Sequence, residues 1–202
     1  MDSPIVANDR LYAYAQIAAQ VYQDTPEFGA VRSAARARRY QGGEILAIRG
    51  TDNYATMLAD LKAAPTRKTA IGQVHAGFYG AIEEIAPQID TLAQTPQVII
   101  GHSEGASVAT GLAGELARIG KPPQLVIAFE PAAMCVDDVL ASLLRDAGVE
   151  VYASKHAIDP VPDVPPWMHY VCPYTSIGAF SLAHIDPIWY HLIGNIIPLY
   201  RT

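Results

Sequence analysis

Residues 101–105 read Gly-His-Ser-Glu-Gly and place Ser103 in a Gly-x-Ser-x-Gly pattern. The pattern follows the apolar run at 98–100 and precedes a helix-like stretch, which is the sequence form of a nucleophile elbow. A serine hydroxyl is a weak nucleophile, so such a turn projects its Oγ toward a histidine base. The turn also aims the next backbone N–H, here that of Glu104, at a developing oxyanion. The pattern therefore predicts nucleophilic catalysis by Ser103.

The elements around this turn follow an alternating order. From about residue 44 to residue 153, segments with helical spacing of apolar residues alternate with short runs that are typical of β-strands. The expected helices cover about 9–23, 54–61, 77–92, 103–119 and 136–146, and the expected strands cover about 30–40, 44–48, 96–100, 124–129 and 149–153. Strands that alternate with helices predict an α/β fold with a mostly parallel sheet.

The parallel sheet predicts where chemistry gathers. Ligand-binding side chains lie at the carboxyl ends of the strands in such a sheet. Ser103 and Thr51 each follow an expected strand closely, and Asp159 lies a few residues past another. We therefore expect these three residues to converge at one edge of the sheet.

Length and composition restrict the class of protein. A chain of 202 residues is most simply one domain, 1–202, and can bury a core large enough for a sheet covered on both faces. Its net charge of −6 argues against a nucleic-acid partner. Its apolar runs are shorter than the roughly 18 to 20 residues of a membrane span. The N-terminus lacks a signal-peptide pattern, so we expect a cytoplasmic protein, with a secreted mature form as the alternative.

Four separated segments share their order and spacing with a known family. They are Arg49-Gly50-Thr51 with the later Asp60-Leu61, Val74-His75-Ala76-Gly77-Phe78, the elbow at 101–105, and the segment from Asp159 to Pro166. Together they resemble the class 3 lipases, the fungal triacylglycerol lipase-like branch of the α/β-hydrolases. The resemblance implies a compact α/β-hydrolase domain whose mostly parallel central sheet is flanked by helices.

The resemblance also implies a catalytic triad and an oxyanion hole. Ser103 would attack an ester carbonyl, a late histidine would accept its proton, and Asp159 would orient that histidine and stabilise its imidazolium. The backbone N–H groups of Thr51 and Glu104 would stabilise the oxyanion. Chemistry of this kind requires no metal and no cofactor.

The same resemblance implies a lid after Thr51. Tyr54, Met57 and Leu58 would present its apolar underside to an acyl chain. Three residues depart from the family pattern. Met57 stands where tryptophan is common, Glu104 replaces an apolar residue, and Ala106 stands where glycine is common. An ionisable group beside the nucleophile is expected to disfavour fatty substrates relative to small soluble ones.

The identity of the base is open between two histidines. Four of the six histidines belong to other motifs or lie too close to the acid: His75, His102, His156 and His169. His184 is favoured, because it follows a small-residue run and precedes the aromatic Tyr190, as the family's base does. His191 is the alternative, because the spacing of 25 residues from Asp159 to His184 is shorter than in the fungal enzymes.

These features favour a serine carboxylester hydrolase, a lipase or esterase that acts through an acyl-enzyme. The expected substrate is a small-molecule or lipid ester, with transient contact to a lipid interface. The sequence does not separate lipase, phospholipase and esterase, because pocket shape sets acyl and alcohol preference. An acyltransferase or thioesterase with the same triad is one alternative. A non-catalytic binding domain that has kept the fold is another.

Overall fold

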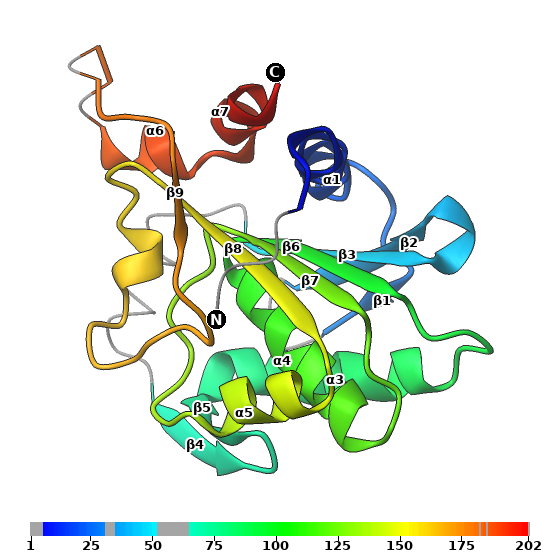
Figure 1. Ribbon diagram of the computed structural model, residues 1–202. Helices are drawn as coiled ribbons and strands as arrows, with labels where there is room; N and C mark the ends of the chain where they lie inside the picture. Colours follow the sequence, from blue (N-terminus) through cyan, green and yellow to red (C-terminus); the bar gives the residue numbers. More distant parts are fainter. Residues whose placement is uncertain (1–5, 31–34, 52–64, 182, 185, 202) are drawn as a thin grey trace.

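A central sheet organises the computed structural model, which describes residues 6–30, 35–51, 65–181, 183–184 and 186–201. Within these residues, seven strands form one sheet in the order β1-β2-β3-β6-β7-β8-β9 (Figure 1). β1 and β2 pair antiparallel at one edge, and every pairing from β3 to β9 is parallel. A mostly parallel sheet, as the sequence predicts, is confirmed.

The bounds of the elements are as follows. The strands of the main sheet are β1 Phe28–Gly29, β2 Arg36–Tyr40, β3 Ile45–Arg49, β6 Val98–His102, β7 Leu125–Phe129, β8 Glu150–His156 and β9 Thr175–Ile177. A separate hairpin is formed by β4 Thr66–Thr69 and β5 Gly72–His75. The α-helices are α1 Asn8–Gln20, α3 Ala76–Asp90, α4 Glu104–Arg118, α5 Val139–Asp146, α6 Pro187–His191 and α7 Ile193–Ile196. The 3₁₀ helices are η1 Gln41–Gly43, η2 Val161–Asp163 and η3 Ile197–Tyr200.

Helices cover both faces of the sheet. α3, α4 and α5 lie on one face, and α1 lies with α7 and η3 on the other (Figure 1). The first core contains Ile82, Leu112 and Leu140, and the second contains Leu11 and Ile100. Both faces of the central strands are thereby buried, which explains why β6 and β7 are almost entirely apolar. No helix in the described part of the chain combines the length and the apolar character needed to cross a membrane.

The register of the parallel strands brings their carboxyl ends to one edge. Gly101 in β6 pairs with Ile48 in β3 and with Ala128 in β7. Ala128 in turn pairs with Ala153 in β8. The residues that follow β3, β6, β7 and β8 therefore emerge at the same edge of the sheet, as expected for Thr51, Ser103 and Asp159.

Several elements differ from the sequence-based expectation. The expected short helix at 54–61 lies outside the described residues. The β4–β5 hairpin, β9 and the short helices α6 and α7 were not predicted. β8 also extends to His156, beyond the expected end at 153. The unpredicted elements are short and gain their order from packing against the main sheet and its helices.

His75 terminates β5 and caps α3. Its Nδ1 accepts hydrogen bonds from the N–H groups of Gly77 and Phe78, at 3.1 and 3.3 Å. Burial lowers the pKa of His75 from 6.5 to about 4. The unfolded chain therefore binds this proton more tightly than the folded protein does. The associated stability is fully present above pH ~6.5 and is lost as the pH falls toward 4.

A His75→Asn variant tests this linkage. Asparagine keeps a side-chain oxygen for the N–H groups of α3 but takes up no proton. Between pH 7 and pH 4, the wild-type free energy of unfolding should fall by up to about 3 kcal/mol more than that of the variant. Urea denaturation at the two pH values measures the difference, with the exposed His169→Asn as control. Equal losses in wild type and His75→Asn would contradict the linkage.

Candidate functional site

Ser103 occupies a sharp turn between β6 and α4. Its backbone has φ 58° and ψ −133°, a conformation that non-glycine residues rarely adopt. Its N–H donates to the carbonyl of Phe129 at 2.9 Å, which ties the turn to the end of β7. Strained backbone that is held by its surroundings is common at catalytic positions. The turn has the geometry that the Gly-x-Ser-x-Gly pattern predicts.

The glycines of the pattern are required by close backbone contact. A Cβ on Gly105 would lie 2.3 Å from the carbonyl oxygen of Ile48. A Cβ on Gly101 would lie 2.3 Å from the carbonyl oxygen of Gly105. Both distances are far below van der Waals contact, so only glycine fits at either position. The start of α4 is thereby pressed against the end of β3.

This contact brings the two expected oxyanion donors into one region. A Cβ on Gly50, which precedes Thr51, would be crowded, because that atom would lie 3.0 Å from both Glu104 Cβ and Gly105 N. Thr51 therefore follows the point where the β3 loop touches the first turn of α4. Burial raises the pKa of the Glu104 carboxyl, and the nearby charge of Arg36 lowers it in part.

Asp159 and His191 form a hydrogen-bonded pair with no solvent exposure. The distance from His191 Nδ1 to Asp159 Oδ2 is 2.7 Å, and both side chains are 0% exposed. The other carboxylate oxygen, Oδ1, accepts from the N–H of Val161 at 2.9 Å. Burial by itself would raise the pKa of Asp159. The charge and hydrogen bond of His191, with hydrogen bonds from Glu130 and Val161, outweigh that effect and lower it.

Two further histidines hold the backbone around His191. His102 Nε2 lies 2.8 Å from the carbonyl oxygen of His191, and His156 Nδ1 lies 3.0 Å from that of Tyr190. A carbonyl only accepts, so each of these ring nitrogens carries the proton and donates. His102 and His156 are the last residues of β6 and β8. The carboxyl ends of these two strands therefore anchor the segment that carries His191.

His102 also connects the elbow to the turn that follows α1. Its Nδ1 accepts from the hydroxyl of Tyr22 at 2.9 Å, and the Tyr22 oxygen accepts from the N–H of Gly50 at 3.3 Å. Burial, with a smaller contribution from His191, lowers the pKa of His102 to about 3. His102 is thus neutral at physiological pH and bridges the Ser103 turn, the His191 segment and the loop before Thr51.

His184 lies elsewhere. Its ring stacks on the indole of Trp189, with centroids 3.8 Å apart and the planes 3° from parallel. Within the described residues its side chain makes no hydrogen bond to Asp159. The structure therefore brings the alternative candidate, His191, to the acid, and does not bring His184 there. The sequence analysis favours His184, whereas the structure pairs His191 with Asp159.

Two site residues were not found from the sequence. Glu130 follows β7 directly. Its carboxyl lies against the turn that leads to Asp159, where it accepts a hydrogen bond from the His156 N–H at 2.8 Å. A charged residue immediately after a continuous apolar strand was the available signal. Tyr22 carried no such signal, because only the packing of α1 brings its hydroxyl to His102.

The expected lid is not part of the described structure. The lid candidates Tyr54, Met57 and Leu58 lie outside the described residues. Among the residues that are described, no group of three or more His, Cys, Asp or Glu side chains is arranged to hold a metal ion.

A Gly105→Ala variant tests the contact on which the elbow depends. The added methyl must displace the Ile48 carbonyl, so the free energy of unfolding should fall by more than about 2 kcal/mol. Gly80→Ala is the matched control, because a Cβ there meets no atom within 4 Å. In the interior of α3 this control should raise stability by about 0.5–1 kcal/mol. Thermal and urea denaturation measure both, and an unchanged stability of Gly105→Ala would contradict the close contact.

Comparisons with known proteins identify a matching family. The family model described as Lipase (class 3) matches residues 45–169. None of the curated proteins matches this sequence.

Several solved fungal lipases share the fold. The native Rhizomucor miehei lipase propeptide complex aligns with a TM-score of 0.61 and 18% identity, over 79% of this chain and 63% of that one. A lipase from Rhizopus microsporus var. chinensis gives 0.63 and 16%, over 79% and 69%. A lipase from Yarrowia lipolytica gives 0.57 and 19%, over 71% and 60%. This chain thus spans about three fifths of the Rhizomucor and Yarrowia lipases. With the family model matching more than half of its length, the chain belongs to the class 3 lipase family.

Proposed function

We propose that this chain is a serine carboxylester hydrolase whose triad is Ser103, His191 and Asp159. The observation that carries the proposal is the 2.7 Å hydrogen bond between the buried His191 and Asp159 side chains. His102, the residue before Ser103, donates to the carbonyl of His191, and the two imidazole centroids are 4.9 Å apart. The acid–base pair is therefore fixed next to the elbow. Membership of the class 3 lipase family supports the same chemistry.

The hydrogen bond sets the tautomer that the reaction needs. With the Nδ1 proton donated to Asp159, the lone pair of His191 is on Nε2 and can accept the proton of the Ser103 hydroxyl. Ser103 Oγ then attacks the ester carbonyl, and Asp159 stabilises the imidazolium that forms. His191 returns the proton to the leaving alcohol, which leaves an acyl-enzyme. Water hydrolyses this intermediate by the same proton transfers.

The oxyanion would be stabilised by backbone N–H groups at the start of α4. Glu104 provides one of them, and Thr51 provides the second from the loop that touches this turn. Because both donors are backbone groups, the carboxyl at Glu104 does not remove the oxyanion hole. Losing one such donor typically lowers turnover by about 10²–10³-fold.

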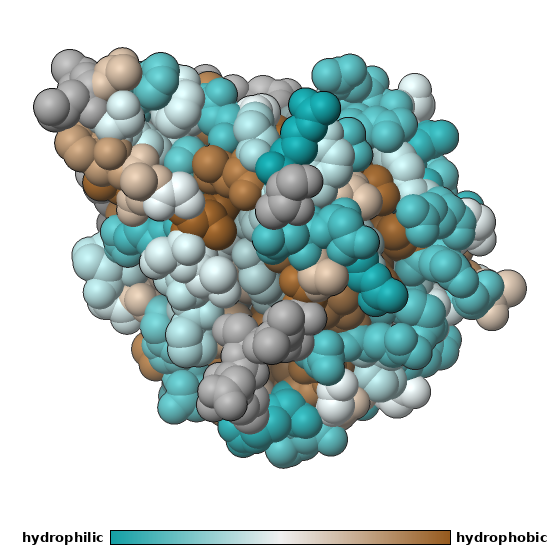
Figure 2. Space-filling view, turned by 45° about the horizontal axis from the view of Figure 1, so that its top comes forward, coloured by the Kyte–Doolittle hydropathy of each residue, from teal (hydrophilic) through white to brown (hydrophobic). Residues whose placement is uncertain are grey.

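The substrate class is an ester with an apolar acyl group. Apolar surface gathers at the upper left of Figure 2, on the side of the molecule where α6 lies in Figure 1. Phe180 and Leu192, which lie before and after α6 in the sequence, are exposed apolar side chains. The Glu104 carboxyl beside the nucleophile opposes long fatty chains, because transfer of an ionised group into apolar surroundings is costly. We therefore expect acyl chains of short to medium length to be preferred.

Hydrolysis of p-nitrophenyl esters from acetate to palmitate tests the triad. Ser103→Ala should lower kcat by about 10³-fold or more, and His191→Ala by about 10²-fold or more. His184→Ala is the matched control, because its ring stacks on Trp189 and should leave kcat close to the wild-type value. Circular dichroism would verify that each variant is folded.

The same series of esters and variants distinguishes the proposed function from its alternatives. Loss of activity in His184→Ala with full activity in His191→Ala would contradict the assignment of the base. If wild type and Ser103→Ala were equally inert on every ester, hydrolysis would be rejected. An acyl-enzyme that forms but is intercepted faster by an added alcohol or thiol than by water would indicate a transferase.

A further inference from the structure

Glu130 is a second carboxyl group buried beside the proposed triad acid. It is the first residue after β7 and is 0% exposed. Its backbone has φ 52°, in the left-handed region that costs a non-glycine residue roughly 1 kcal/mol or more. A buried acid in such a conformation requires compensating interactions. They come from β8 and from the turn that follows it.

The hydrogen bonds of Glu130 connect it to the chain around Asp159. Ser154 Oγ donates to Oε1 at 3.1 Å, and the N–H of His156 donates to Oε2 at 2.8 Å. The N–H of Asp159 donates to the carbonyl of His156 at 2.9 Å, so both acids are bound to the same turn. Both side chains are fully buried at this turn, and each carboxyl group affects the pKa of the other.

Two buried carboxyl groups held at the same turn are most stable when one of them carries a proton and can donate it to the other. Carboxylates only accept, and two buried negative charges in contact repel each other strongly. Asp159 has the stronger stabilisation of its charge, because His191 and the Val161 N–H both donate to it. Glu130 receives donors that are neutral. The shared proton therefore belongs to Glu130.

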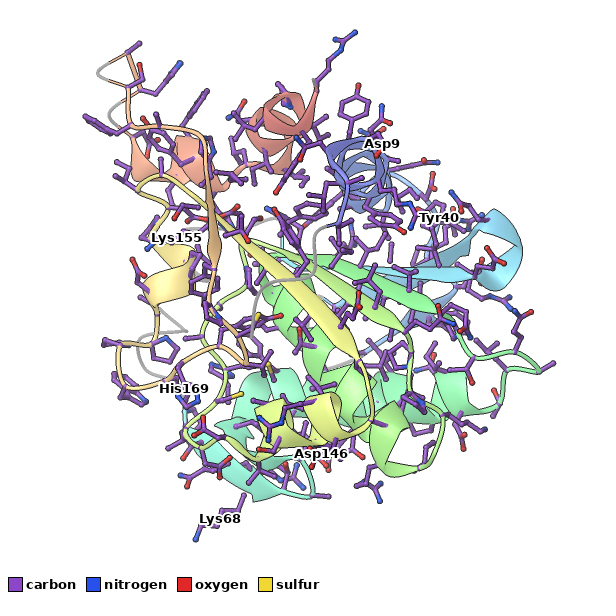
Figure 3. All side chains as sticks on the ribbon, in the orientation of Figure 1. Asp9, Tyr40, Lys68, Asp146, Lys155 and His169 are labelled. Atoms are coloured by element: carbon purple, nitrogen blue, oxygen red, sulfur yellow. The ribbon has the colours of Figure 1, made fainter. Side chains whose placement is uncertain are left out.

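Among the residues that the structure describes, the remaining groups that interact with Glu130 supply no positive charge. Those that interact with it electrostatically are Asp159 and the phenols of Tyr152, Tyr174 and Tyr200. Burial lowers the pKa of His156, so this imidazole is neutral. Lys155, the cation of β8, lies beside η2 (Figure 3), where its Nζ donates to Asp163 at 2.6 Å.

We propose that Glu130 is a positioning residue that stays protonated and donates its O–H to Asp159, which keeps Asp159 ionised and directed at His191. The inference rests on the proposed function, because Asp159 acts there as the triad acid. Burial, with the charge and hydrogen bond of Asp159, raises the pKa of Glu130 well above its ordinary value, in agreement with this assignment.

Carbon-13 NMR of the side-chain carboxyl groups tests the protonation state directly. At pH 7 the wild-type protein should show a glutamic acid carboxyl carbon in the neutral position. This signal should disappear in Glu130→Gln and persist in the matched control Glu115→Gln, which removes another buried glutamate. The Asp159 carbon, assigned with Asp159→Asn, should be in the ionised position. An ionised Glu130 or a neutral Asp159 at pH 7 would overturn the proposal.

Ester hydrolysis tests the positioning role. Glu130→Gln retains an N–H donor toward Asp159 and should keep kcat close to wild type, whereas Glu130→Leu removes the donor. The leucine variant should lower kcat by about tenfold or more with KM unchanged, because Glu130 does not touch the substrate. An unaltered kcat in folded Glu130→Leu would overturn the role. Equal losses in the folded Gln and Leu variants would do the same.

The NMR and kinetic measurements distinguish a failure of the proposed function from a failure of the inference about Glu130. If the wild type hydrolyses no ester, the proposed function is rejected, and the NMR signals still determine whether Glu130 is the protonated partner. If hydrolysis depends on Ser103 but Glu130 is ionised, only the inference about Glu130 is rejected. The wild-type spectrum decides the protonation state even if Glu130→Leu does not fold.

Discussion

Two imidazole N–H groups determine where the proposed catalytic base lies. His102 and His156 end parallel strands that flank β7, and they donate to the consecutive carbonyls of His191 and Tyr190. The segment that carries His191 has only short helices and little core of its own. These two hydrogen bonds tie that segment to the ends of β6 and β8, in addition to the packing of α7 and η3 against α1. The sheet register fixes the strand ends, and the histidines transmit that register to the base.

Neutrality of the surrounding groups is the second requirement. Burial lowers the pKa values of both His102 and His156, so each presents a neutral N–H donor at physiological pH. Glu130, as proposed, is neutral as well. The negative charge at the site is then concentrated on Asp159, where it can stabilise an imidazolium at His191. In a low-dielectric interior this arrangement is more effective than it would be in water.

The sequence predicted the regular part of this fold because its signals are local. Apolar runs such as Leu125–Phe129 and the helical spacing of Ile82, Ile85 and Ile89 identify buried elements without reference to the rest of the chain. The elbow was equally local, because Gly101 and Gly105 directly flank the turn that excludes any Cβ.

No local sequence signal identifies the catalytic base, and for that reason the sequence left the choice between His184 and His191 open. His184 and His191 both follow the proline-rich segment, in a part of the sequence without a strong periodic pattern, and sequence spacing alone does not decide which ring reaches Asp159. The choice follows from tertiary contacts: Tyr190 bonds to Ser181 and to His156, which directs the next residue inward. Glu130 was missed for a similar reason. A glutamate after a strand is ordinarily exposed, and only the packing of β8 against β7 buries it.

The most direct test of the proposed triad is covalent labelling of Ser103 with diethyl p-nitrophenyl phosphate, followed by mass spectrometry. The reagent requires an activated serine but no suitable acyl pocket, so it separates activation of the nucleophile from substrate preference. Wild type and His184→Ala should gain one diethylphosphoryl group on Ser103 at similar rates. The labelling rate of His191→Ala should be lower than that of wild type by about 10²-fold or more. Rapid labelling of His191→Ala together with slow labelling of His184→Ala would contradict the assignment of His191 as the base.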